Sequence, residues 1–584
     1  MRRTLCTRVT VAAGTALFLT LAGLYLAGMA EPVASAGSAS LFVRPAGSGT
    51  TCSQAAPCTL ATALMQAVDG DMLYLAAGTY TGAGNQAVVQ VTHSITVYCG
   101  WDGGAAWPPV RNPAAHVSVL DGEGQRRGIH VARGLHVAVD SCTVVRGNAT
   151  TGDSPGRGGG IYIFDSVAVL SHNVISGNLA SGSPGLNGMG GGLYIDFADG
   201  SLLVENRVEH NVAAAQAHGS GGGMAIHGAA GIVLRDNAVL HNTASITAGL
   251  ADGGGIYLSS SDYALVENNR IESNIAQNGW YPDTPAEGGG LYLGFSQGMT
   301  ITGNTISNNI ASLLRVGIGG GISMDHIDDT LVRDNLLQGN AGCRGGDGCG
   351  GYGGGLYAYE SSPVTVEANL FLSNVASQGP FGYGGGLYLC RDSSFALTNN
   401  IIAGNHATSR GGGLTFESDV GDPVTATLRH NTFVNNDGVN VAGKSAVHIP
   451  AAGVTLDMAN NIISGHSLGV RGEAGSTATL SRNLFFNNPL GDTVGDGIVN
   501  TAPITGQDPL LGATYHLSAG SPAIDAGVPA GVGVDIDGNP RPMGAGVDIG
   551  ADEYPATAPT LLYLPLALRN VQVWATRGVQ PYGF

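Results

Sequence analysis

The chain has 584 residues, of which 94 are glycine, and only 12% are charged. One lysine, Lys444, and a formal net charge of −18 exclude the basic surface that nucleic-acid binding requires, so we expect no nucleic-acid partner. The glycines lack the every-third spacing of collagen, which excludes that fibre class.

Residues 1–36 have the features of an export signal. Arg2, Arg3 and Arg8 precede an apolar run that ends at Met29, and Ala34-Ser-Ala36 offers small residues for cleavage. We therefore expect a signal peptide, no further membrane span, and a secreted or cell-surface protein. An uncleaved membrane anchor is the alternative.

The cysteines that follow the signal suit an oxidising compartment. Two close pairs lie in loops rich in glycine, serine or alanine, and we expect a disulfide in each: Cys52 with Cys58, and Cys343 with Cys349. Cys99 and Cys142 are a further candidate pair across neighbouring turns, which would leave Cys390 free.

Residues 37–110 combine a cysteine loop, a helical pattern and a strand. Apolar residues recur at helical spacing from Thr59 to Val68, and the stretch from Gly70 to Tyr80 reads as a strand closed by a Gly-Thr turn. This arrangement resembles the opening of right-handed parallel β-helix proteins of the pectin-lyase-like superfamily. The resemblance implies a short helix that caps the end of the coils.

A phrase of three glycines, an aliphatic residue and usually a tyrosine then recurs nine times. It begins at Gly158, Gly190, Gly221, Gly253, Gly288, Gly319, Gly353, Gly384 and Gly411. A period in this range is typical of a solenoid, in which each unit buries a face against the next one. We expect the triplets to allow positive φ and a close pass of the preceding loop.

A second phrase, Asn-x-aliphatic-x-x-Asn, keeps step with the first. Its pairs run from Asn173 and Asn178 to Asn431 and Asn436, and it persists less completely to Asn488. Side-chain amides stacked at strand spacing can bond to one another, so we expect ladders at two corners of the coil.

Each unit contains three short strand patterns separated by polar or glycine turns, as in residues 288–309. Together these features predict an all-β, right-handed parallel β-helix over residues 111–490. The repeats also resemble those of polymorphic outer membrane proteins, although a third glycine replaces their alanine. Because the stretch after the repeats is short for the C-terminal barrel of those proteins, we do not expect self-export.

Residues 491–555 differ in composition. Ser518-Ala-Gly-Ser-Pro-Ala-Ile-Asp525, Asp535-Ile-Asp-Gly-Asn-Pro-Arg-Pro542 and Val547-Asp-Ile-Gly-Ala-Asp-Glu-Tyr554 resemble the choice-of-anchor Q domain of exported bacterial β-helix proteins. The resemblance implies a C-terminal cap and retention at the cell envelope. In the tail, residues 556–584, the apolar run 561–568 is too short to span a bilayer.

The block at 535–553 also offers oxygen ligands. Asp535, Asp537 and Asn539 alternate, with a glycine at position 538, as oxygen ligands do in calcium loops, but the later glutamate of an EF-hand is missing. We favour a hydrogen-bonded loop in which Arg541 pairs with an aspartate, and we expect no metal and no other cofactor.

A carboxylate group inside the repeats is the candidate catalytic centre. Asp325, Asp328 and Asp329 lie within one short segment, and carboxylate pairs perform acid–base hydrolysis when suitably spaced. We favour the alternative that these are solvated acids in a turn, with no catalytic residue among them.

The tyrosines of the glycine phrase are candidate ligand-binding residues. Strand alternation turns them outward, where they would form a column that stacks on sugar rings; the column comprises Tyr162, Tyr194, Tyr257, Tyr292, Tyr357 and Tyr388. We favour the alternative that the loops fold over these rings and bury them.

The sequence thus favours a non-catalytic, adhesin-like or glycan-binding scaffold, with polysaccharide or a cell-envelope component as its partner. The alternative is a polysaccharide lyase or glycoside hydrolase.

Overall fold

The computed structural model describes residues 38–82, 86–247, 250–279, 285–346, 348–418, 421–437, 444–450 and 453–555. The expected signal peptide and the tail from residue 556 lie outside these described residues. Within the described part, no helix is long and apolar enough to cross a bilayer.

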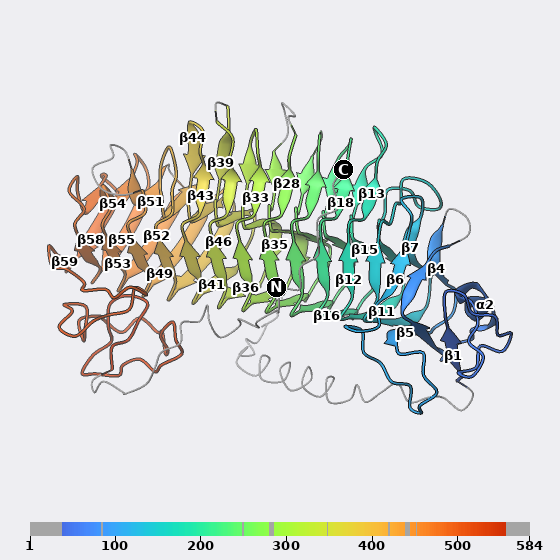
Figure 1. The fold of residues 1–584 in the computed structure, drawn as a ribbon. Helices are drawn as coiled ribbons and strands as arrows, with labels where there is room; N and C mark the ends of the chain where they lie inside the picture. The colour runs from blue at the N-terminus through green and yellow to red at the C-terminus, as the bar shows by residue number, and fades with distance from the viewer. Residues whose placement is uncertain are drawn as a thin grey trace, which may run out of the picture.

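The chain winds into the expected parallel β-helix (Figure 1). One coil runs through β30 (Leu291–Gln297), β31 (Thr300–Thr302) and β32 (Thr305–Ser307), and the next begins at β35 (Ile322–Asp328). Each strand pairs in parallel with its counterpart one coil on, as Leu291 does with Ile322. Alternate residues point into a continuous apolar core, because side chains of a strand alternate between its two faces.

Among the described residues, three long sheets contain 16, 14 and 15 strands. They run from β1 (Ser40–Val43) to β58 (Ile498–Thr501), from β4 (Ala87–Val91) to β57 (Thr493–Val494), and from β3 (Gly78–Tyr80) to β59 (Ile504–Thr505). The coils therefore continue to Thr505, beyond the boundary at residue 490 that the repeats predicted.

The loops before the glycine triplets form two further parallel sheets, each of seven strands in the described chain. The first runs from β13 (Leu179–Ser181) to β43 (Val375–Ser377), and the second from β14 (Gly188–Met189) to β44 (Phe381–Tyr383). They rise together as a thin ridge along the top of the coils (Figure 1). Only small residues fit between them, since a Cβ on Gly188 would lie 1.8 Å from the carbonyl oxygen of Ala213.

The expected asparagine ladders are present at two corners. The Nδ2 of Asn274 donates to Oδ1 of Asn309 at 3.0 Å, and Asn309 donates to Asn340 in the same way. The same Oδ1 of Asn309 also accepts the backbone N–H of Asn274, and each Nδ2 donates to a backbone carbonyl one coil back. Every polar atom of these buried amides is satisfied by the neighbouring coils.

The two ends differ. Helix α2 (Leu60–Gln66) lies at the N-terminal end, where Leu60 and Ala63 join the core and Thr59 caps the helix by accepting the N–H of Thr62. Residues 507–555, the C-terminal block, contain no helix or named strand and lie beside the last coils (Figure 1). Ile536 and Ala551 of this block pack on the outer face of the 15-stranded sheet.

Three disulfides are present in the described part of the chain. The expected Cys52–Cys58 and Cys343–Cys349 bonds are confirmed, and Cys99 bonds Cys142 across neighbouring turns. Cys390 is buried and outside any disulfide. Disulfides of this number indicate folding in an oxidising compartment.

Candidate functional site

The tyrosine column lies where the 14-stranded sheet meets the second seven-stranded sheet. The rings stack between coils, with centroids 5.7 Å apart for Tyr162 and Tyr194 and 5.1 Å for Tyr257 and Tyr292. Four of the six predicted rings are buried, and Tyr257 and Tyr357 are partly exposed; the buried rings are Tyr162, Tyr194, Tyr292 and Tyr388. The loops thus cover the column, as the favoured alternative stated, and no open platform forms from these six rings. Contact with a ligand remains a prediction for them.

Facing these rings is the residue that precedes each glycine triplet. Its identity changes from coil to coil, as the series Met189, Ser220, Asp252, Glu287, Ile318, Tyr352 and Tyr383 shows. We call this row, together with the tyrosine column and the outward residues beside it, the junction. The first glycine of each triplet adopts positive φ, 63° at Gly253, and turns the chain from the ridge into the 14-stranded sheet.

Three carboxyl groups from successive coils meet in the middle of the junction. Asp252 of β24 (Ala251–Asp252) pairs in register with Glu287 of β29 (Ala286–Glu287), so their Cα atoms are about 4.8 Å apart. The Oγ of Ser323 donates to Oε2 of Glu287 at 3.1 Å. Asp325 lies two residues after Ser323 on the same face of β35, which puts it roughly 6.6 Å from Ser323.

Asp325 accepts a hydrogen bond on each oxygen. The hydroxyl of Tyr292 donates to Oδ2 at 3.2 Å, and Nδ1 of His326 lies 2.7 Å from Oδ1. The other ring nitrogen of His326 lies 2.8 Å from Glu360. Asp325 is thereby held in place by groups from its own coil and the preceding one.

The surroundings favour protonated carboxyls at the two ridge positions. Burial, followed by the nearby charges of Glu287 and Asp325, raises the pKa of Asp252 to about 8. Burial and Asp325 raise the pKa of Glu287 to about 7, against a smaller opposing effect of the Ser323 hydrogen bond. Near neutral pH the junction therefore contains proton donors beside an oxygen acceptor.

The other two predicted acids do not belong to this group. Asp328 ends β35 and accepts the N–H of Ser362 at 3.2 Å, while Asp329 has a φ of 47° in the turn that follows. Both are exposed. Of the three candidate catalytic aspartates, only Asp325 faces the junction.

Sequence reasoning missed Asp252 and Glu287. Each directly precedes a glycine triplet, in two consecutive units, at a position where other units have unrelated residues. Alignment of the units on the triplet exposes that acidic pair. What it does not reveal is that the ridge folds back onto the strand that contains Asp325.

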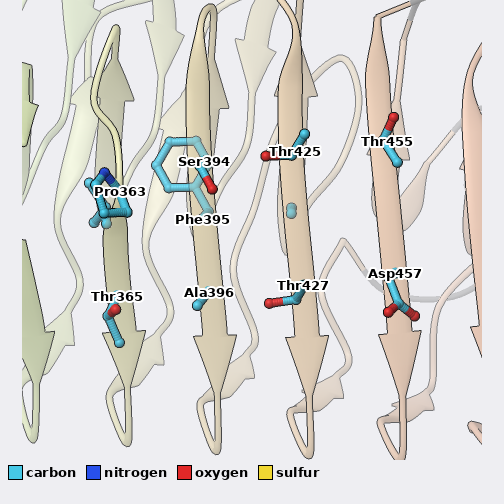
Figure 2. Close-up of a pocket in the computed structure, with 11 residues that line it drawn as sticks. Pro363, Thr365, Ser394, Phe395, Ala396, Thr425, Thr427, Thr455 and Asp457 are labelled. Carbon is cyan, nitrogen blue, oxygen red and sulfur yellow. The ribbon is translucent and has the colours of Figure 1, made fainter. Parts of the chain in front are cut away.

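Two shallow depressions lie elsewhere. One of about 240 Å³ lies on the outer face of the 16-stranded sheet, where Figure 2 shows Thr365, Thr427 and Asp457 in one row across neighbouring strands. Its single carboxylate, Asp457, is paired with Arg429. We place the candidate chemistry at the junction instead, because three acids of adjacent coils converge there, whereas this depression has a single carboxylate.

The C-terminal block forms a hydrogen-bonded loop, as the sequence favoured. Asp535 accepts the backbone N–H groups of Asp537 and Asn539 at 2.9 and 2.7 Å, which leaves this aspartate occupied within the loop. The expected partner of Arg541 was wrong: the buried guanidinium pairs with Glu553 at 2.7 Å instead of an aspartate. The glutamate sits opposite the guanidinium because the chain folds back at residues 548–553.

The fold resembles several solved structures at low identity. Pectate lyase Pel9A is 13% identical over 89% of this chain and 97% of its own, with a TM-score of 0.31. XylC in complex with xylose is 10% identical over 88% and 98%, with a TM-score of 0.37. The periplasmic alginate epimerase AlgG is 10% identical over 74% and 77%, with a TM-score of 0.28. These values support no inference about the reaction.

No curated protein matches the sequence. The family model described as a right-handed β-helix region matches residues 117–350 and 251–456, which together span more than half of the chain. The nine glycine triplets and most of the two amide ladders fall within this span. The chain belongs to the right-handed β-helix family.

Proposed function

We propose that this chain is an exported glycoside hydrolase that acts at the junction, with Glu287 as general acid and Asp325 as general base or nucleophile. The observation that supports the proposal most is the proximity of two carboxyl groups in different environments. The pKa of Glu287 is raised to about 7, and Asp325 accepts two hydrogen bonds. Pairs of acids in unlike surroundings divide the roles of acid and base.

Glycoside hydrolysis needs such a pair on either side of the glycosidic bond. One carboxylic acid protonates the leaving oxygen, and the other group activates water or attacks the anomeric carbon. Ser323 and Asp325 are roughly 6.6 Å apart along β35. Because Ser323 is hydrogen-bonded to Glu287, the carboxyl groups of Glu287 and Asp325 are separated by a distance of the same order. Glycosidase carboxyls lie about 5 to 9.5 Å apart.

The charge of the junction favours neutral glycans. A uronate polymer has a carboxylate on each sugar; bringing it beside Asp325 is unfavourable, and its charge would further oppose ionisation of Asp252 and Glu287, whose pKa values are already raised. Lyase chemistry on such polymers also suits the junction less well, since the only lysine of the chain is Lys444, on a different coil. Asp252, when neutral, offers a donor and an acceptor to sugar hydroxyls.

A binding surface without turnover is the second candidate. It is favoured by the parallel stack of Tyr257 and Tyr292, whose planes differ by 1°, because Tyr257 is partly exposed beside the carboxyls. In either case the predicted signal peptide and the disulfides support a secreted or cell-surface location. The resemblance of the C-terminal block to a choice-of-anchor domain supports retention at the envelope.

The test is release of reducing ends from a panel of neutral and acidic polysaccharides. We expect turnover of a neutral glycan, lowered about 10² to 10⁴-fold in both Glu287→Gln and Asp325→Asn. Asp328→Asn is the matched control, because this aspartate lies on the same strand outside the junction. Circular dichroism verifies that each variant folds.

Two results would overturn the proposal. Full activity in Asp325→Asn would remove the junction from the reaction. Binding of a glycan with no new reducing ends in the wild type would establish the second candidate.

A further inference from the structure

The C-terminal block is irregular and contains no cysteine, because the last cysteine of the chain is Cys390. No disulfide can therefore link its segments to one another. His516, Asp537 and Asp552 come from three of these segments, and one ligand atom of each lies within 4.8 Å of the others. The Nε2 of His516 is 2.9 Å from Oδ2 of Asp537. We propose that His516, Asp537 and Asp552 bind a divalent transition-metal ion that fastens this block.

The orientation of the imidazole is an independent argument for a ligand. Nδ1 of His516 lies 3.0 Å from the carbonyl oxygen of Thr514 and 2.9 Å from its hydroxyl. A hydrogen bond from Nδ1–H to a carbonyl leaves the lone pair of Nε2 directed at the two carboxylates. Histidines that bind metals are held in this way, by donation of the second ring N–H to a backbone oxygen.

The dimensions suit a small ion. Zinc lies about 2.0 to 2.2 Å from nitrogen and oxygen ligands, which puts tetrahedral ligand atoms about 3.4 Å apart. The ligand atoms of the three residues are 2.9 Å apart for His516 and Asp537 and no more than 4.8 Å apart for any pair, so this range includes 3.4 Å. Shifts of roughly an ångström would therefore place all three at bonding distance from one ion. Asp552 is buried and is already oriented by the N–H of Leu517 at 2.7 Å. His516 and Asp537 are partly exposed, which leaves room for water as a further ligand.

A route to the site is also present. A depression of about 360 Å³ between the 15-stranded sheet and the block is lined in part by Asp535 and Asp537. Imidazole nitrogen with carboxylate oxygen is a ligand set that suits Zn²⁺ better than Ca²⁺. Calcium at Asp535, Asp537 and Asn539, the alternative drawn from the sequence, is disfavoured because the side chains of Asp535 and Asn539 are bonded to each other.

A second histidine provides the contrast. His172 also lies between two acids, but its Nδ1 approaches Asp140 and its Nε2 approaches Glu205, each at 3.3 Å. The two acids lie on opposite sides of the ring, so they cannot share one ion. His172→Gln is therefore the matched control for loss of a histidine next to two acids.

The test is zinc binding by the full chain after treatment with a chelator, followed by calorimetry and metal analysis. We expect one tight Zn²⁺ per chain, with affinity lowered at least about tenfold in His516→Gln and in Asp537→Asn and unchanged in His172→Gln. Added Zn²⁺ should raise the unfolding temperature of the wild type but not of His516→Gln. The wild-type stoichiometry tests the site even where a variant fails to fold.

The competing account is a simple ion pair between a protonated His516 and the two aspartates. Burial lowers the pKa of His516, but the hydrogen bond to Asp537 and the charge of Asp552 outweigh it and raise the pKa to about 9. That account predicts no stoichiometric zinc at neutral pH, or equal zinc in the wild type and His516→Gln. Either outcome overturns the proposal.

Discussion

The asparagine corners and the junction are built on the same coils but follow opposite rules. At the corners the same residue recurs in unit after unit, because each amide bonds to the one above and the one below. At the junction the residue before the glycine triplet varies along the chain, from Met189 and Ser220 through Asp252 and Glu287 to Ile318 and two tyrosines. Repetition therefore marks positions that hold the solenoid together, and departures from it mark positions free to acquire chemistry.

The largest effect is expected from a break in a ladder. Asn309→Leu leaves the backbone N–H of Asn274 and the carbonyl of Ile271 without partners in a buried corner. At about 1 to 3 kcal/mol for each unpaired group, we expect a loss of roughly 2 to 6 kcal/mol, measured by denaturant unfolding. Asn308→Asp is the control, because Asn308 is exposed. Equal losses in the two variants would contradict the ladder as the source.

A smaller loss is expected from the covered tyrosines. Tyr194 is 2% exposed between Tyr162 and Ala225, so Tyr194→Ala leaves a cavity at a cost of about 3 kcal/mol. Tyr263, at 60% exposed, serves as the control, and Tyr263→Ala should change the unfolding free energy by less than about 0.5 kcal/mol. An unchanged midpoint in Tyr194→Ala would show that the rings do not pack in solution.

The smallest expected effect is a gain in stability, on replacement of Asp252. The pKa of Asp252 in the folded chain is about 8, above its ordinary value of 3.8, so the folded state binds an extra proton between these pH values. Stability from this group is therefore present at low pH and is lost as pH rises towards 8.

Asp252→Asn removes that dependence. We expect similar stability at pH 4 and a variant more stable by on the order of 1 kcal/mol at pH 9, measured by thermal unfolding at both values. A wild type more stable than the variant at pH 9 would show that the carboxyl is not strained at this position.

The sequence predicted the repeated positions of the coil well and the variable positions of the junction poorly. The Asn173–Asn488 series and the glycine triplets predicted the coils, the inward residues and the ladders, because both patterns recur at the same place in successive units. The two seven-stranded sheets were missed, since strands such as Gly188–Met189 are too short and too small for an alternating pattern. Asp325 was a candidate for its local acids, whereas its real neighbours, Asp252 and Glu287, are brought to it by the ridge.

The C-terminal block shows a different limit. Its motifs predicted a cap, and Arg541 was expected to find an aspartate. Which acid meets a buried guanidinium depends on how irregular segments cross, and periodicity has no information about such crossings. The position of the block against the 15-stranded sheet depends on outward apolar residues such as Ile401, which resemble core residues in the sequence.

The direction of the amide ladders has a consequence for assembly. Where one ladder amide bonds to the next, the donor lies on the earlier coil and the acceptor on the later one, as for Asn173 with Asn206 and Asn461 with Asn483, so each ladder has a direction. Two copies stacked end to end with their strands in the same direction would meet head to tail, and a head-to-tail contact that does not close produces an open filament. Helix α2 packs against β1 and β4 at the N-terminal end of the coils, where it occupies the place that a second copy would need.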